Sequence, residues 1–480
     1  MSRIAALVVS AFLASAQAGI DPGAASAAID ALMAEEMRTM RIPGAAVAVV
    51  ENGRVVVERA YGIANLETGT PVETDSVFLL ASITKQFTAA AIMMLVEEGK
   101  VRLDDPLSVY VSPTPPAWER ITIRHLLTHT SGLDIAAIPR PLGSAPLRVT
   151  KAQAFEFIAQ QRLQWPTGRV GWYSDAGYFL LGMVVEKASG QTYHEFLERR
   201  VLQPLQMTAT RIADSSQIVN KRVSMYGLRG GEHINWRLVW DYELGSFAGI
   251  SSTLQDLARW DASLRRPAPL KPSSLEQIWT PAKLENGQNA RVLDSLYGFG
   301  WELADVRGRP TVGHGGGSGT YILRFVDEPL TIIVLTNLEA GSGERHHKLL
   351  ARAIAGVVRP QYRPPHMLSP RDDPDPDTTR QVAALFADIG AKRVSAAMSD
   401  AYRAWYASDP GAQAWYARQL GGVTALKYLA HDDLAGRSIW GGEPLDRMIH
   451  YVAEGRSRPL YLSVAVTRDR RVAALDYYSR

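Results

Sequence analysis

The stretch Leu79–Lys100 reads LLASITKQFTAAAIMMLVEEGK and carries the strongest signal in the chain. Its apolar residues have helical spacing and stop at Gly99. Ser82 stands in the first turn of this expected helix, and Lys85 follows three residues later, so both side chains project from one face. A buried lysine is costly unless it is paired or its pKa is shifted. The stretch therefore predicts a specific role for Lys85.

A helix N-terminus suits a serine that carries negative charge. Free backbone N–H groups and the helix dipole there favour an alkoxide or an acyl oxyanion on Ser82. Lys85 is then placed to take the Ser82 proton, or to hold a group that takes it. From this spacing alone, an N-cap serine followed by a surface lysine remains an alternative.

Two later segments carry further candidate residues. Trp172–Tyr178 reads WYSDAGY. We interpret it as a polar turn that carries Tyr173 and opens an amphipathic helix. The alternative is a plain turn with an aromatic staple. Gly313–Gly317 reads GHGGG, late on an expected strand, and its simplest interpretation is a glycine turn. A phosphate loop would need a Lys-Ser/Thr ending, which is missing. A lipase-type oxyanion loop would need a G-x-S-x-G elbow, which this chain lacks.

Taken together, the three segments resemble the serine β-lactamase and penicillin-binding protein superfamily. That superfamily has Ser-x-x-Lys, Tyr-x-Asn and Lys/His-x-Gly in this order. The nearest likeness is to its class C β-lactamase-like branch, which also holds D-Ala-D-Ala carboxypeptidases, D-aminopeptidases and esterases. The resemblance spans about Ala27 to Val358 and includes four other stretches, Thr122–Leu133, Trp165–Gly168, Pro204–Met207 and Ala248–Thr253.

The resemblance implies a role for each matching residue. Ser82 would be the acylated nucleophile, and Lys85 and Tyr173 would be the proton-transfer pair. The backbone N–H groups of Ser82 and Gly317 would form the oxyanion hole. No metal and no cofactor are implied, and the substrate would be a small molecule or peptide with an amide or ester bond. The remaining residues expected at the substrate are Asp175, His314, Gly315 and Gly316.

Two of these positions depart from the family pattern. Asp175 stands where the pattern has asparagine, and its carboxylate would favour the charged form of Lys85 and repel an anionic substrate. His314 stands where many members have lysine, and histidine is only partly charged near neutral pH. Both changes favour a peptidase, or a neutral ester or amide substrate, over an efficient penicillinase.

The other histidines do not predict a metal site. His125 and His129 are four residues apart on an expected helix, but no glutamate follows His125 as a zinc H-E-x-x-H motif requires. We interpret both as structural. The adjacent His346 and His347 are expected to point apart on the surface of a closing helix, residues Arg345–Val358.

The expected fold is α/β (α+β), with an antiparallel sheet flanked by helices and an all-helical subdomain inserted in it. Asn52-Gly53 predicts a tight hairpin between Ala45–Val50 and Val55–Tyr61. Later strands are expected at Gly298–Leu303, Thr311–Gly315, Thr320–Val326 and Thr331–Leu335. Residues 19–358 would form the hydrolase domain, 359–377 a Pro/Asp-rich linker, and 378–480 a small α+β accessory domain. The last domain is expected to start with helices over Gln381–Ala407 and Ala412–Leu420 and to end in strands at Arg447–Val452, Pro459–Val466 and Val472–Tyr478. It carries no catalytic motif, so residues after about Arg371 are expected to be dispensable for the chemistry and to act, if at all, by gating access to the site.

The N-terminus predicts export. A basic start, an apolar run from Ile4 to Ala14 and Ala16-Gln17-Ala18 together resemble a signal peptide of residues 1–18, cleaved after Ala18. The alternatives are a buried helix or a membrane anchor, although the run is short for a membrane span. We expect a periplasmic or secreted protein with no membrane span after cleavage. The 480 residues include no cysteine, which excludes disulfides and a thiol nucleophile.

The charge composition limits which binding partners are expected. The formal net charge is +3, with acidic and basic residues mixed along the chain, so nucleic acid is not an expected partner. The oligomeric state is not predicted. The leading hypothesis is a serine hydrolase that works through an acyl-serine intermediate. The alternative is a catalytically impaired binding or regulatory protein, in which Asp175 marks lost chemistry.

Overall fold

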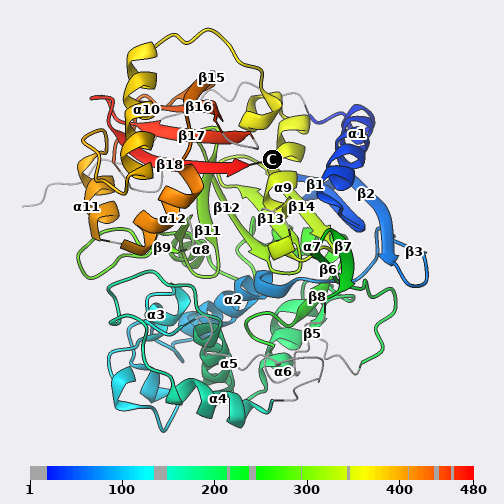
Figure 1. Ribbon diagram of the computed structural model, residues 1–480. Coiled ribbons are helices and arrows are strands. Elements are labelled where there is room, and N and C mark those ends of the chain that lie inside the picture. The colour runs from blue at the N-terminus through cyan, green and yellow to red at the C-terminus, as the bar shows by residue number, and fades with distance from the viewer. Residues whose placement is uncertain are drawn as a thin grey trace, which may run out of the picture.

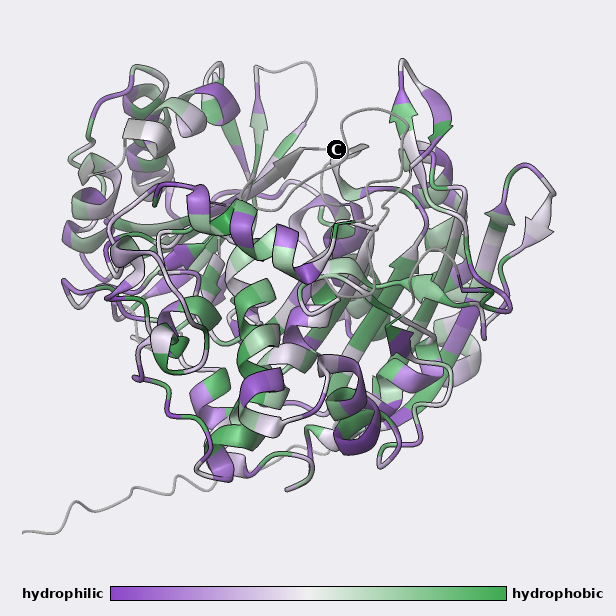
Figure 2. Cartoon of the chain, turned by 90° about the horizontal axis from the view of Figure 1, so that it is seen from below, coloured by the Kyte–Doolittle hydropathy of each residue, from purple (hydrophilic) through white to green (hydrophobic). Residues whose placement is uncertain are grey.

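The computed structural model describes residues 19–134, 149–212, 217–236, 245–292, 295–342, 346–408, 410–436, 443–455 and 459–479. The expected signal peptide lies outside these residues. The described part of the chain forms three regions: a large sheet with helices on both faces, a helical region below it, and a C-terminal region on top (Figure 1). Figure 2 shows that hydrophobic residues predominate on the strands of the large sheet.

The large sheet is antiparallel throughout its nine described strands. In spatial order they are β3 (Thr70–Pro71), β2 (Arg54–Asn65), β1 (Gly44–Glu51), β14 (Leu330–Thr336), β13 (Thr320–Phe325), β12 (Arg309–Gly316), β11 (Glu302–Val306), β10 (Ser295–Tyr297) and β9 (Arg291–Val292). The two early strands therefore pair with the late ones, as the sequence predicts. Asn52 and Gly53 join β1 to β2 with positive φ angles of 53° and 73°, the geometry of a tight hairpin turn.

Helices cover both faces of this sheet. Successive residues of β1 point to opposite sides: Ala45 and Val47 contribute to one apolar core, and Ala46 and Ala48 to the other. The first core lies under α1 (Pro22–Met40) and α9 (His346–Val358). The second lies against α2 (Thr84–Glu97), α7 (Leu254–Ser263) and α8 (Pro272–Ile278).

The helical region packs on α2 and supplies the remaining walls of the second core (Figure 1). Its helices are α3 (Ile123–Leu127), α4 (Lys151–Gln160), α5 (Asp175–Ser189) and α6 (Tyr193–Leu197). Two small sheets border it, one of β4 (Phe78–Leu79), β8 (Ile250–Ser252) and β5 (Arg211–Ile212), the other of β6 (Tyr226–Arg229) and β7 (Glu232–Asn235).

The C-terminal region has its own apolar core. Three helices, α10 (Pro376–Gly390), α11 (Asp400–Ser408) and α12 (Pro410–Leu420), pack on an antiparallel sheet. The sheet runs β15 (Ala425–Asp433), β16 (Arg447–Glu454), β17 (Leu460–Val466) and β18 (Val472–Ser479) in sequence order.

One expected strand starts too early. Residues 298–301, the start of the predicted strand at Gly298–Leu303, form a turn between β10 and β11. Gly300 has a φ of +76°, and a Cβ there would lie 2.5 Å from the carbonyl oxygen of Lys85. Only glycine fits this left-handed position. The glycines therefore mark a turn that passes close to the helix bearing Lys85.

Candidate active site

Ser82 lies in a 3₁₀ turn, Ala81–Ile83, that leads directly into α2. Ala81 has a φ of 47°, in the left-handed region that residues other than glycine rarely occupy. The backbone before it is fixed, because the Leu80 N–H donates to the Ile250 carbonyl oxygen at 2.8 Å. Strained backbone held in this way is typical of functional sites. It presents a half-buried Ser82 hydroxyl at the start of α2.

Lys85 is fully buried and makes three hydrogen bonds. Its Nζ donates to Ser82 Oγ at 3.2 Å, to Asp175 Oδ1 at 2.7 Å and to the Phe247 carbonyl oxygen at 3.0 Å. The Nζ also lies 4.8 Å from the centre of the Tyr173 ring. Burial lowers the pKa of Lys85, although the charge of Asp175 opposes the shift. A lysine with a lowered pKa beside a serine hydroxyl is suited to act as a base.

The Tyr173 segment ends where α5 begins. Ser174 is the N-cap of α5, and its Oγ accepts the Gly177 N–H at 3.2 Å. Asp175 follows in the first turn, and this places its carboxylate on Lys85. Burial, followed by the charge of Asp175, raises the pKa of Tyr173 well above 10, while a hydrogen bond with Ser82 lowers it. Tyr173 therefore stays a protonated phenol at neutral pH.

His314 lies on β12, facing Tyr173, with 6.2 Å between the ring centres. Its Nδ1 is 2.8 Å from the Gly315 carbonyl oxygen, so this nitrogen carries the hydrogen and donates it. The Nε2 then accepts the Tyr297 O–H at 2.8 Å. Burial lowers the pKa of His314 to about 4. The ring is therefore neutral near pH 7 and supplies no positive charge for a substrate carboxylate.

The glycines after His314 bring β12 against the Ser82 turn. A Cβ on Gly316 would lie 2.1 Å from the Leu80 carbonyl oxygen, so only glycine allows this approach. The Thr320 hydroxyl donates to the same carbonyl at 3.0 Å. Gly317 comes next, exposed in the turn between β12 and β13. The strand residue before it, Gly316, thus packs against Leu80, two residues before Ser82. The oxyanion-hole role of the Gly317 N–H stays a prediction.

His129, which we interpreted from the sequence as structural, lies beside the site and supports it. Its ring packs on three tyrosines, with centre distances of 4.4 Å to Tyr173, 5.1 Å to Tyr178 and 4.7 Å to Tyr297. Its Nδ1 accepts the Ser174 N–H at 3.1 Å. Burial, reinforced by the charge of Lys85, holds its pKa well below 6.5. His129 therefore stays neutral and supports the backbone between Tyr173 and Asp175.

Sequence reasoning also missed Tyr297, which orients His314. The available signal was the run Tyr297–Trp301, whose alternating glycines mark a tight turn next to an aromatic residue. For His129, the signal was the segment Thr122–Leu133, which the family resemblance already included.

The prediction for His346 and His347 is wrong. Both are buried, with 1% and 5% of their surface exposed. His346 Nε2 lies 3.0 Å from the Thr336 hydroxyl, and the His347 ring packs 5.8 Å from that of Tyr321. The reason is that α9 packs on β13 and β14, and the side of the helix that carries both histidines faces the sheet.

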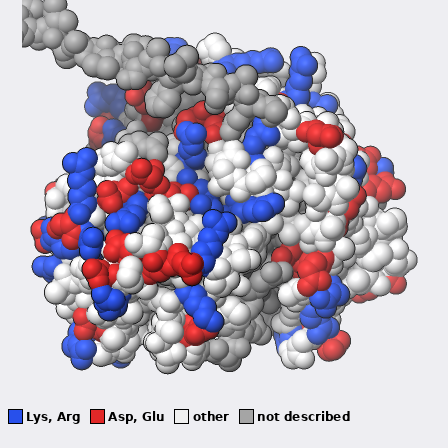
Figure 3. All heavy atoms as spheres, turned by 90° about the horizontal axis from the view of Figure 1, so that it is seen from above, with Lys and Arg blue, Asp and Glu red and all other residues white. Residues whose placement is uncertain are grey.

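The part of the chain that the structure describes offers neither a metal site nor a membrane-spanning helix. No group of histidines, aspartates and glutamates there has the arrangement of a metal site. Within the same residues, no helix combines the length and apolar character needed to cross a membrane. On the face seen in Figure 3, acidic and basic side chains are interspersed.

Comparison with known families agrees with this geometry. A family model described as Beta-lactamase matches residues 29–356. The chain belongs to the beta-lactamase family. The predicted resemblance, which spans about Ala27 to Val358, is thereby confirmed, and so is the expectation of a serine hydrolase of this superfamily.

Relatives within the beta-lactamase family differ in activity. Penicillin-binding protein 4* of Bacillus subtilis (strain 168) is 29% identical over 327 residues, which are 61% of this chain and 68% of that protein. A D-aminopeptidase of Brucella anthropi is 28% identical over 337 residues, 68% of this chain and 62% of that enzyme. A Beta-lactamase of Escherichia coli (strain K12) is 28% identical over 267 residues, 55% of this chain and 67% of that enzyme. The chain thus matches only about two thirds of each relative's length.

Two solved structures share the fold. EstCE1, a hydrolase with promiscuous acyltransferase activity, aligns with a TM-score of 0.61 and 22% identity, over 70% of this chain and 99% of that chain. The octameric penicillin-binding protein homologue from Pyrococcus abyssi aligns with a TM-score of 0.60 and 21% identity, over 94% of this chain and 95% of that chain. At these identities the likeness shows the fold alone.

Proposed function

We propose that this beta-lactamase family member hydrolyses amide or ester bonds through an acyl-enzyme on Ser82. The observation that carries the proposal is the fully buried Lys85 amine, 3.2 Å from the Ser82 hydroxyl oxygen and paired with Asp175. A nucleophile with a base in hydrogen-bond reach, next to backbone N–H donors, is what acyl transfer requires.

The protonation states of Tyr173 and Lys85 indicate which of them acts as the base. Tyr173 stays a phenol, so the base is Lys85 in its neutral form. The neutral amine keeps its two hydrogen bonds to Asp175 and the Phe247 carbonyl, and its lone pair accepts the Ser82 proton across the 3.2 Å contact. Ser82 Oγ then bonds to the substrate carbonyl carbon, and the N–H groups of Ser82 and Gly317 stabilise the oxyanion. The ammonium formed on Lys85 is stabilised by Asp175 at 2.7 Å. This gives Asp175 a use in catalysis besides raising the pKa of Lys85.

Collapse of the tetrahedral intermediate breaks the bond to the leaving amine or alcohol. Tyr173, hydrogen-bonded with Ser82, donates its phenol proton to that leaving group and regains a proton from Lys85. Water then attacks the acyl carbon, its proton returns through the same groups, and the acid product leaves with Ser82 restored. No metal enters these steps.

The substrate we propose is a neutral ester or amide, including a D-amino-acid peptide without a carboxylate near the reacting bond. Two observations support this choice. The negative charge of Asp175 lies within the site, and His314 is neutral and bonded to Tyr297. The relative from Brucella anthropi that is named as a D-aminopeptidase also supports this choice.

The test is covalent labelling followed by a substrate panel. A fluorophosphonate probe, which carries no carboxylate, should label the wild-type chain but not Ser82→Ala, and a fluorescent penicillin should label the wild type less. Turnover of a p-nitrophenyl ester should fall on the order of 10⁶-fold in that variant. The panel compares this ester with a chromogenic cephalosporin and D-Ala-D-Ala peptides. A folded wild-type chain that does not label would instead support the binding or regulatory alternative.

We also propose that the protein is exported, periplasmic or secreted, with residues 1–18 removed. The sequence of the N-terminal run supports this proposal. Expression of the full chain followed by N-terminal sequencing of the exported product should give Gly19 as the first residue. A mature chain that retains Met1 would contradict it.

A further inference from the structure

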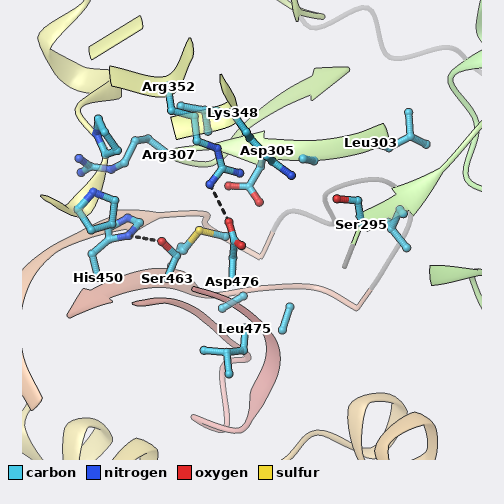
Figure 4. Close-up of a pocket in the computed structure, with 18 of the residues that line it drawn as sticks. Ser295, Leu303, Asp305, Arg307, Lys348, Arg352, His450, Ser463, Leu475 and Asp476 are labelled. Carbon is cyan, nitrogen blue, oxygen red and sulfur yellow. Dashed lines mark hydrogen bonds and ion pairs between the residues drawn. The ribbon is translucent and has the colours of Figure 1, made fainter. Parts of the chain in front are cut away.

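The C-terminal region contacts the edge of the large sheet next to the active site. Two ion pairs hold it there: Arg352 Nη1 to Asp476 Oδ2 at 2.8 Å, and Arg307 Nε to Asp432 Oδ2 at 2.7 Å. Between them lies a cavity of about 160 Å³, lined by residues of β10, β11, α9 and the C-terminal sheet. Figure 4 shows Arg352 from α9 meeting Asp476 from β18 across it. The contact is therefore built of specific pairs on both sides.

A separate contact reaches the outermost strand. Trp405 of α11 packs against the guanidinium of Arg291 in β9, with the Arg291 Cζ 5.7 Å from the ring centre. This is a cation–π arrangement. β9 has only two residues and pairs with β10 through Val292–Ser295 and Arg291–Leu296. The Trp405 ring is therefore one of the contacts that hold this short edge strand.

The other side of β9 touches the segment that carries Tyr173. A Cβ on Gly171 would lie 2.3 Å from the Arg291 carbonyl oxygen and 3.1 Å from the Val292 side chain. Gly171 stands two residues before Tyr173. The backbone of Arg291 therefore packs closely against the start of this segment. Beyond Tyr173, the Ser174 N–H is bonded to His129.

We infer that Arg291 is a positioning residue for Tyr173, and that Trp405 of the C-terminal region holds it in place. The inference rests on the proposed function, since it assigns a support to the tyrosine of that reaction. It also revises the expectation that residues after Arg371 are dispensable. Displacements of about 1 Å in a reacting group can cost 10²-fold in rate. Loss of the contact should therefore slow acylation rather than weaken substrate binding.

The experiment uses the full-length chain with Trp405→Ala, Arg291→Met and the double variant. Each single variant should lower kcat on the p-nitrophenyl ester about 10-fold with KM nearly unchanged, on the scale of a small misplacement. The double variant should be no slower than the slower single one, because both remove one contact. Trp405→Phe keeps an aromatic ring and should retain most of the activity.

Two further comparisons distinguish misplacement of Tyr173 from a general destabilisation of the fold. In a Tyr173→Phe background, Trp405→Ala should cause no additional loss in the residual acylation rate measured with a fluorophosphonate. Asp432→Asn disrupts the Arg307 ion pair elsewhere in the same interface and should leave kcat unchanged. Thermal unfolding of every variant checks that the compared chains are folded.

The inference is overturned if Trp405→Ala and Arg291→Met both keep wild-type kcat. It is also overturned if their losses persist in the Tyr173→Phe background, or if Asp432→Asn loses as much activity. If Trp405→Ala does not fold, Arg291→Met and Trp405→Phe decide the outcome. The proposed function fails on a different result, namely labelling that survives Ser82→Ala.

Discussion

Asp175 controls the charge of Lys85, the base of the proposed reaction. Its carboxylate opposes the lowering of the Lys85 pKa that burial causes. Asp175→Asn removes that charge but keeps an oxygen that can accept the Lys85 hydrogen bond. The protonated amine then loses its partner, so the pKa of Lys85 should fall further. We expect the acidic limb of the kcat/KM profile to move to lower pH.

The same substitution should change substrate preference. Without the carboxylate, the site should tolerate an anionic substrate better, so activity on a carboxylate-bearing β-lactam should rise relative to a neutral ester. Parallel pH profiles of wild type and Asp175→Asn on both substrates provide the measurement. If neither the pH profile nor the activity ratio changes, the ion pair has no part in catalysis.

His314 should not titrate in the working range. Its pKa of about 4 means that the ring stays neutral above about pH 5. We therefore expect His314→Gln to change the size of kcat/KM on a neutral ester but not the shape of its profile between pH 5.5 and 8. Loss of an inflection near pH 6.5 in the variant would show that His314 ionises during turnover.

For individual residues, the sequence predicts site residues that are neighbours along the chain. It misses residues that reach the site only through tertiary contacts. Ser82 and Lys85 are three residues apart, and helical geometry alone brings them together. His129 supports Tyr173 from a segment more than forty residues away, and Tyr297 orients His314 across a sheet edge. Neither contact leaves a periodic pattern in the sequence.

The start of α5 determines how the Tyr173 segment is held. Ser174 caps this helix through its side chain, and its own N–H is bonded to His129. Ser174→Ala removes the cap and should cost about 1 kcal/mol of stability. Because Tyr173 and Asp175 flank this residue, kcat should fall as well. Urea unfolding and ester kinetics measure the two effects.

Ser174→Thr is the matched control, because threonine keeps a hydroxyl that can cap the helix. It should recover most of both the stability and kcat. An alanine variant with reduced stability but unchanged kcat would show that the cap acts on α5 alone and does not align Tyr173.

Among the secondary-structure elements, turn residues predicted the structure better than one long helical pattern did. Asn52-Gly53 gave the β1–β2 hairpin directly, because its positive φ angles suit few other residues. The helix expected over Gln381–Ala407 instead ends at Gly390, and α11 starts at Asp400. Strand β15 was missed because its exposed polar residues on a sheet edge resemble a loop.

The C-terminal region is joined to the hydrolase fold by specific contacts and is not an independent unit. Alignment with the Pyrococcus abyssi homologue covers 94% of this chain, which leaves about 29 of 480 residues outside it (6% of 480), so the shared fold extends into the C-terminal region. Ion pairs and the Trp405–Arg291 contact join that region to the sheet edge. The sequence could not predict this, because the partners lie more than one hundred residues apart.

The cavity at this junction should make stability depend on pH through Asp305 of β11. Its Oδ1 accepts the Gly308 N–H at 3.3 Å, and burial raises its pKa to about 6. The charge of Arg352 from α9 opposes this shift, while Asp476 from β18 and Asp432 from β15 reinforce it. Asp305 therefore favours the fold most when protonated, below its unfolded pKa near 3.8, and this contribution is lost as pH rises through about 6.

Asp305→Asn mimics the protonated carboxyl at every pH. Near pH 8 it should be more stable than wild type by at most about 3 kcal/mol, the equivalent of a shift of about two pKa units. The gain should shrink as pH falls below about 6 and nearly vanish near pH 4. Urea unfolding at both pH values measures it, with Asp372→Asn at an exposed position as a control for the substitution itself. An equal gain at both pH values would show that the asparagine acts through packing, and no gain at pH 8 would show that Asp305 ionises in the cavity without cost.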